Sequence, residues 1–363
     1  MKAVEAVRHI DDVMFELCND FRTLDHLIPT NRQKEREVFF DHITQGKVYN
    51  PQFEYEISVG PMQELKEKLL SIDCGDSPLA PIYKNTIREL LTRIELISHI
   101  GSDAITDQSQ KIYGIPGADL IQQAKDIIRK TREFKEPDRI FGIKVVEEQL
   151  REQFTIHRID GWTVREESKN IWLAECDTVH RKINLQPGIL ANKTMIDQFI
   201  RHMIDVSVFR WSNGRRQPLK IFAIGMDGQD ETEDGLSLEL ELRFQPYKDH
   251  HLRRYAGRVL AVSYSMEHSF FEVFRILAQH FPAERAYSMT ERCKIGLRDT
   301  SQKGGFLRDH IYLQGRNKLK SLKSEELKLL YVGKVSLQYM ALFKTLLENK
   351  EILSPALLPL YLR

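Results

Sequence analysis

The chain has 363 residues, a length that allows one large domain or two ordinary ones. Hydrophobic residues make up 42% and charged residues 29%, which is typical of a folded globular protein and excludes a disordered chain. The formal net charge of +1 gives no reason to expect a nucleic acid or a membrane as a partner, and no apolar run approaches the roughly 18 residues of a membrane helix. Acidic residues interrupt the N-terminal region that would be apolar in a signal peptide, so we expect a cytoplasmic protein.

The first 135 residues are predicted to be mainly helical. Apolar residues recur at helical spacing over 6–21, and a second amphipathic pattern over 83–101 ends at Gly101, because glycine is favoured just beyond a helix. A turn at 114–117 precedes a further helix. The composition changes near residues 134–142, which predicts an N-terminal helical region over 1–135 and a second domain over 136–363.

A small antiparallel sheet is predicted next, from three short segments rich in β-branched and aromatic residues: 154–165, 170–178 and 180–188. Helical patterns dominate after them, with one helix expected over 192–211, a second over 232–244 and several more towards the C-terminus. A small sheet combined with many helices indicates an α+β fold that is mostly helical.

The sheet and the next two helices have the layout of a zinc peptidase. Such an enzyme needs two histidines on one helix face, a glutamate beside the first histidine as general base, and a third, acidic ligand from the next helix. An edge strand beside these helices, either 170–175 or 180–186, would hold an extended peptide by strand addition.

Several short stretches match one known family in its own order, from about residue 25 to the C-terminus. They include VYNPQFEY (48–55), SQKIYGIP (109–116), NGRRQPLKIFAIG (213–225), TEDGLS (232–237), RYAGRVLA (254–261), GGFLRDHIYLQG (304–315) and LLYVGKV (329–335). In these stretches the sequence resembles the family of the tubulin tyrosine carboxypeptidases and the bacterial flavohemoglobin expression-modulating QEGLA-motif proteins. The resemblance implies a gluzincin-like metallopeptidase fold for the second domain.

The resemblance also implies a damaged zinc site. The family carries an H-E-x-x-x-H pattern just before "NG", and its third ligand lies in an E-G-L-A segment. His202 matches the first histidine, Met203 stands at the position of the general-base glutamate, Ser207 at that of the second histidine, and Asp234 at that of the third ligand. Catalytic zinc needs three protein ligands, so the implied cofactor is none, or a weakly bound divalent metal, zinc if any. Loss of the general base alone typically costs about 10²–10⁴-fold in rate.

Two alternatives for this region stay open. Asp205 lies three residues after His202 on the same predicted helix face and would complete a rearranged metal site with Asp234. Otherwise Asp205 is solvated, or paired with an arginine such as Arg210.

Basic and aromatic residues in the matching stretches form the predicted substrate-binding or anion-binding set: Arg215, Arg216, Arg258, Arg292, Arg308 and Tyr312. Guanidinium groups bind carboxylates well, so this set would hold a peptide C-terminus or another anion. The competing interpretation is an internal salt-bridge network with Glu231, Glu233 and Asp299.

We therefore expect a pseudo-peptidase without confirmed catalytic residues, which binds a peptide tail or a protein partner in a retained cleft. The alternative is an active metal-dependent peptidase or amidase, rearranged around His202, Asp205 and Asp234. A third class, a partner subunit in an assembly or an enzyme of another kind, has only the altered motif to support it.

Overall fold

The computed structural model describes residues 3–57, 60–133, 137–167, 172–244 and 248–363. The predicted domain boundary after residue 135 lies outside these ranges, so the division into two domains stays a proposal. Within the described ranges, no helix is long and apolar enough to cross a membrane.

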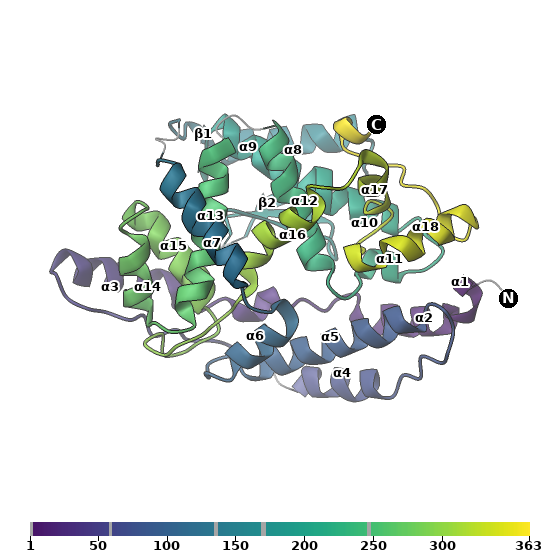
Figure 1. The fold of residues 1–363 in the computed structure, drawn as a ribbon, viewed down its shortest axis with the longest axis horizontal. Coiled ribbons are helices and arrows are strands. Elements are labelled where there is room, and N and C mark those ends of the chain that lie inside the picture. The colour runs from purple at the N-terminus through teal and green to yellow at the C-terminus, as the bar shows by residue number, and fades with distance from the viewer. Residues whose placement is uncertain (1–2, 58–59, 134–136, 168–171, 245–247) are drawn as a thin grey trace.

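Helices dominate the N-terminal part, as the sequence predicts. Its elements are α1 (Ala3–Ala6), α2 (Arg8–Cys18), the short 3₁₀-helix η1 (Leu24–Leu27), α3 (Arg32–Thr44), α4 (Gly60–Leu70), α5 (Ala80–Ser98), α6 (Ile105–Tyr113) and α7 (Ala118–Lys130). Figure 1 shows α2, α4, α5 and α6 as a layer along one side of the molecule. The largest hydrophobic core combines Met14 and Tyr83 of this layer with Phe209 and Tyr331 from the second half of the chain.

The middle of the chain carries the strands and the first helices of the candidate site. Its elements are β1 (Phe141–Gly142), α8 (Ile143–Ile156), β2 (Thr163–Glu166), β3 (Ala174–Asp177), β4 (Lys182–Leu185), β5 (Leu190–Ala191), α9 (Lys193–Phe199), η2 (Ile200–Val208), α10 (Phe209–Gly214) and α11 (Ile221–Ile224). One sheet pairs β1 with β5, and the other has the order β2-β4-β3. The α+β class, mostly helical with small sheets, is thus confirmed.

The prediction of a purely antiparallel sheet is wrong in one pairing. Strands β3 and β4 are antiparallel because a short turn joins them, but β2 runs parallel to β4. Strand β4 lies between β2 and β3, so neighbours in sequence are not neighbours in the sheet. The first residues of the predicted strand 154–165 belong to helix α8 instead.

The helix predicted over 192–211 begins at Asn192, whose side chain accepts a hydrogen bond from the backbone N–H of Met195 at 2.9 Å. Its middle, η2, is a π-helix, in which each backbone hydrogen bond spans five residues rather than four. Positions five apart would lie about 140° apart around an α-helix. The wider π turn instead brings them close to each other.

The C-terminal part is again helical, with α12 (Gln229–Phe244), α13 (Lys248–Ser265), α14 (Phe270–Leu277), α15 (Ala283–Lys294), η3 (Arg308–His310), α16 (Ile311–Leu319), α17 (Ser324–Leu329), η4 (Leu337–Tyr339), α18 (Met340–Glu348) and η5 (Leu360–Leu362). Helices α12 and α16 cross near the centre of Figure 1 at backbone contact. A Cβ at Gly235 would lie 2.6 Å from the carbonyl carbon of Gly315, and a Cβ at Gly315 would collide with the carbonyl oxygen of Glu231. The two glycines therefore set how closely the helix with Asp234 approaches α16.

Candidate functional site

The π turn keeps the two histidine positions of the family motif on one side of the helix. The Ser207 hydroxyl lies 3.3 Å from the carbonyl oxygen of His202, which is five residues earlier. Met203 and Ser207 are both buried, and the His202 side chain is 21% exposed. The helix thus retains the geometry of an i, i+5 ligand pair although its second member is a serine.

The side chain at position 207 contacts Glu233 rather than Asp234. The Ser207 hydroxyl donates to Glu233 Oε1 at 2.8 Å, and Arg210 Nη1 lies 2.7 Å from Glu233 Oε2. Burial disfavours the ionised form of Glu233, but the charges of Lys334 and Arg210 and the Ser207 hydrogen bond outweigh it and lower the pKa of this carboxyl. The sequence interpretation assigned no site role to Glu233, although TEDGLS offers two adjacent acids.

Asp234 lies between a histidine and an arginine. His202 Nε2 is 3.8 Å from Asp234 Oδ1, and Arg308 Nη2 is 2.7 Å from Asp234 Oδ2. Burial raises the pKa of Asp234 to about 7, and the guanidinium of Arg308 offsets this only in part. The predicted approach of His202 and Asp234 is therefore present, but an arginine takes the other oxygen of the acid.

Three of the predicted anion-binding arginines gather around His202. Burial lowers the pKa of His202 to about 4, and the positive charges of Arg308, Arg258 and Arg292 add to this effect, while Glu233 opposes it. The ring of Tyr312 lies 6.0 Å from the His202 ring. His202 is thus a neutral imidazole at physiological pH.

Carboxylates hold these three arginines, as the internal-network interpretation expected, but they are not the expected carboxylates. Arg292 forms a bidentate ion pair with Asp309, and Arg258 lies 3.9 Å from the same carboxyl. Arg308 binds Asp234. The partners named from the sequence are used elsewhere, since Glu231 binds Lys318, Glu233 binds Arg210, and Asp299 accepts from Gln52.

Arg215 and Arg216 do not join this cluster. Both are exposed, and the Arg215 guanidinium lies over the rings of Phe15 and Trp211, at 5.7 and 6.0 Å. Neither is among the charges that shift His202 or Asp234. Their motif matches the family, but Arg215 contacts Phe15 of α2 and Arg216 is exposed, so neither is placed to bind a ligand at His202.

Asp205 also stays outside the cluster. It is buried on η2, and Arg201 Nη1 lies 2.5 Å from its Oδ2. Burial raises its pKa, and the charges that oppose this come from Arg201, His157 and Arg363 rather than from His202. Asp205 is therefore paired with an arginine, as one alternative expected, but that arginine is Arg201 rather than Arg210, and Asp205 is buried rather than solvated.

The donor set around His202 does not fit a catalytic zinc ion. Within the described ranges, no three His, Cys, Asp or Glu side chains are placed to hold a metal. His202 is the single nitrogen donor, Asp234 is bound to Arg308, and Glu233 is bound to Arg210 and Ser207. A metal would have to displace a guanidinium from a buried carboxylate, which costs several kcal/mol per uncompensated charge, as an order of magnitude.

The N-terminal layer fixes the start of α12, which carries these acids. Arg93 of α5 binds Asp230 at 2.9 Å, Glu89 accepts from the backbone N–H of Gly228 at 2.8 Å, and the Thr86 hydroxyl accepts from that of Asp227 at 3.1 Å. Because α5 holds residues 227, 228 and 230 at and just before the start of α12, residues far from the motif determine where Glu233 and Asp234 lie.

A cavity of about 230 Å³ lies beside strand β3 and the start of α12. Its lining includes residues Glu175–Val179 at and after β3, Asp230 at the start of α12, and the side chains of Arg308 and Lys334. Two strands are predicted to bind a peptide. Strand β3 lies at the edge of its sheet and can accept an added strand. The prediction for the segment 180–186 is wrong, because it forms β4, the central strand. The cavity thus lies along the open edge of β3.

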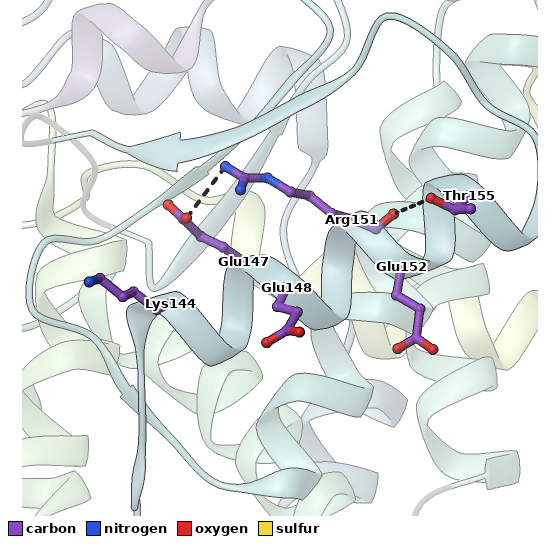
Figure 2. Close-up of a pocket in the computed structure, with 6 residues that line it drawn as sticks. All are labelled: Lys144, Glu147, Glu148, Arg151, Glu152 and Thr155. Atoms are coloured by element: carbon purple, nitrogen blue, oxygen red, sulfur yellow. Dashed lines mark hydrogen bonds and ion pairs between the residues drawn. The ribbon is translucent and has the colours of Figure 1, made fainter.

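A second cavity, on helix α8, is more open than the one beside β3. Figure 2 shows that its six labelled residues all project from one helix, α8, with Arg151 paired to Glu147 at 3.4 Å. Five of the six are charged, as is typical of a solvated helix face.

Comparison with known proteins shows the family of the chain. The family described as "Microtubule-associated tyrosine carboxypeptidase" matches residues 37–363. Two similar relatives are named microtubule-associated tyrosine carboxypeptidase 1. The one from Mus musculus is 28% identical over 298 residues, or 80% of this chain and 54% of the relative, and the one from Rattus norvegicus is 27% identical over 296 residues, with the same shares. The chain spans about half the length of these curated relatives. The family resemblance seen in the sequence is confirmed, and the chain belongs to the microtubule-associated tyrosine carboxypeptidase family.

Proposed function

We propose that this chain is a non-hydrolytic member of its family, which binds a peptide or protein tail in the cavity beside β3. One observation carries the proposal: the side chains at two metal-ligand positions, Ser207 and Asp234, are held by other groups of the protein. Ser207 donates to Glu233, and Arg308 binds Asp234. Met203, buried at the general-base position, has no group that accepts a proton. The cytoplasmic location expected from the sequence is part of the same proposal.

The open edge of β3 supports peptide binding. Gln186 donates its backbone N–H to the carbonyl of Leu173 at 3.1 Å, so residues 173, 175 and 177 use their backbone groups towards β4. The backbone groups of Ala174 and Cys176 therefore point away from β4. An extended peptide would pair with them as an added strand, with its end in the cavity.

The rearranged metal enzyme has less support. It requires Asp205 to turn towards His202, and Asp205 instead forms a buried ion pair with Arg201. Breaking such a pair would leave a carboxylate buried without a counter-charge.

The test combines elemental analysis with peptide binding and cleavage, using an N-acetylated hexapeptide that ends in tyrosine. We expect zinc well below one atom per chain, and saturable binding without release of tyrosine. Stoichiometric zinc together with tyrosine release that a chelator abolishes would falsify the proposal.

A backbone variant tests the strand addition directly. Cys176→Pro removes an N–H that points to the open edge, whereas proline is tolerated on edge strands at such positions. We expect peptide binding to be lost while the thermal unfolding midpoint changes little. Cys176→Ala is the matched control and should bind as the wild type does.

A further inference from the structure

Two buried amide side chains of the NGRRQPL stretch hold a segment near the C-terminal end of the chain. Gln217 Nε2 donates to the carbonyl oxygen of Leu353 at 2.8 Å, and Gln217 Oε1 accepts from the N–H of the same residue at 2.8 Å. Asn213 binds Leu357 in the same way, at 2.8 and 2.9 Å, and Asn213 Oδ1 also accepts from the N–H of Ala356 at 2.9 Å. Each amide thus binds the donor and the acceptor of one residue, as a paired β-strand does.

The two amides are also anchored away from residues 353–363, which we call the strap. Asn213 Nδ2 donates to the carbonyl oxygen of Tyr331 at 2.8 Å, and Gln217 Nε2 donates to that of Val332 at 3.0 Å. Because these bonds do not involve the strap, they keep both amides oriented when it is absent. The groove is therefore formed before a ligand binds, which lowers the cost of ordering it. Its amides bind backbone groups, so they accept a chain whatever its side chains are.

Little else holds the backbone of the strap. Among the described residues, every hydrogen bond between that backbone and another part of the chain ends on Asn213 or Gln217. Pro355 and Pro359 have no N–H, and Pro359 has the polyproline conformation, with φ −58° and ψ 152°. The Leu360 side chain is 76% exposed. A segment with so few bonds and buried groups opens at a lower free energy than the core.

Docking of the strap carries two local costs. Lys350, just before the strap, has φ 57°, in the left-handed region that favours glycine. The hydroxyl group of Tyr361 is buried, and within the described ranges it has no hydrogen-bond partner. A buried hydroxyl without a partner has given up its hydrogen bonds to water. Release of the strap would relieve both costs.

We propose that the strap is a releasable ligand of its own groove, and that the vacated groove binds an extended segment of a partner protein with the same chemistry. That chemistry is apolar, uncharged and interrupted by proline, since residues 352–362 read ILSPALLPLYL. The residues that line the cavity beside β3 include neither the two amides nor any part of the strap. The inference therefore does not depend on tail binding in that cavity.

Hydrogen exchange on the full chain tests the release. The three strap N–H groups that bond to Asn213 and Gln217 should exchange together, at least about tenfold faster than the paired N–H groups of β4. Tyr361→Phe removes the unpaired hydroxyl and should slow their exchange about fivefold to a hundredfold, without changing that of β4. Leu360→Ala, at an exposed side chain, is the control and should change neither. Exchange of the three groups only at the rate of global unfolding would overturn the proposal.

Fluorescence anisotropy tests the groove, with a labelled, N-acetylated peptide of residues 352–363. In the wild type the strap competes with this probe. Leu362→Ala removes a buried side chain of the strap, so this variant should bind the probe at least about tenfold more tightly than the wild type does. N-methylation of the probe at Leu357 removes the N–H that Asn213 accepts, and should weaken binding about tenfold. The matched control is N-methylation at Leu358, whose N–H neither amide accepts.

The remaining outcomes decide against the groove or its partner. Equal affinity of the two methylated probes, or no binding of the probe to Leu362→Ala, would overturn the groove as a binding surface. Should Leu362→Ala not fold, excess probe added to the wild type should speed exchange of the three strap N–H groups, and unchanged exchange would overturn the groove. A concentration-dependent dimer of the wild type in light scattering would show that two copies exchange straps, and would overturn the assignment to a separate partner.

Discussion

Ser207 donates a hydrogen bond of 2.8 Å to Glu233 from the position where the family carries its second histidine. A neutral serine hydroxyl is a weak ligand for zinc, but it satisfies one oxygen of a buried carboxylate, and Arg210 binds the other. The replacement therefore does more than delete a ligand. It allows the acid to be held by the protein itself.

Rebuilding the motif should restore metal binding. We expect the double variant Met203→Glu, Ser207→His to raise bound zinc from well below one atom per chain towards one, because the π turn already places positions 202 and 207 together. The larger histidine in a buried position should cost about 1–3 kcal/mol of stability. Inductively coupled plasma mass spectrometry measures the metal. Adding His202→Ala to the double variant should abolish the gain, and unchanged zinc in the double variant would contradict the prediction.

His202 should make the protein more sensitive to acid. The pKa of His202 falls from 6.5 to about 4 on folding, so between these values the unfolded chain takes up a proton that the folded chain does not. Stability is therefore lost as the pH falls from 6.5 to about 4, by at most about 3 kcal/mol for this group. His202→Gln should reduce the difference in unfolding free energy between pH 7 and pH 4.5, measured in urea. An equal difference in variant and wild type would refute the lowered pKa.

Arg210 should be among the most costly residues to replace. Its fully buried guanidinium binds Glu233 and two carbonyl oxygens of the loop that carries Lys334. Arg210→Met leaves Glu233 without its closest counter-charge, and we expect a loss of about 3–5 kcal/mol in the free energy of unfolding. The exposed Arg216→Met is the control and should change it by less than about 0.5 kcal/mol. Comparable losses of unfolding free energy in the two variants would contradict the prediction that Arg210 is costly to replace.

The crossing of α12 and α16 should not tolerate side chains at its glycines. Gly235→Ala places a Cβ 2.6 Å from the backbone of Gly315, so the helices must separate, and we expect a loss of at least about 2 kcal/mol. Gly117→Ala is the control, since a Cβ there meets nothing within 4 Å. Thermal unfolding measures both. Separation of the helices should also be detectable as a change in the pKa of His202, because Asp234 and Arg308 come from these two sides of the crossing.

The sequence by itself determined the elements and the residues of the motif. The apolar period of residues 83–101 corresponds to α5, the segment 232–244 lies within α12, and TEDGLS places an acid before the glycine of the α12–α16 crossing. Such features depend on local spacing, which a single chain displays directly. Family membership followed in the same way from short ordered stretches.

Tertiary structure alone decided which charges meet. The sequence contains an arginine at 308 and one at 215, both in matching stretches, but only Arg308 reaches Asp234, while Arg215 lies over Phe15. The role of Glu233, the π turn of η2 and the central place of β4 were equally invisible. The physical reason is that burial and ion pairing are set by contacts between distant segments. A buried carboxylate pairs with the cation that the packing of the whole chain places beside it.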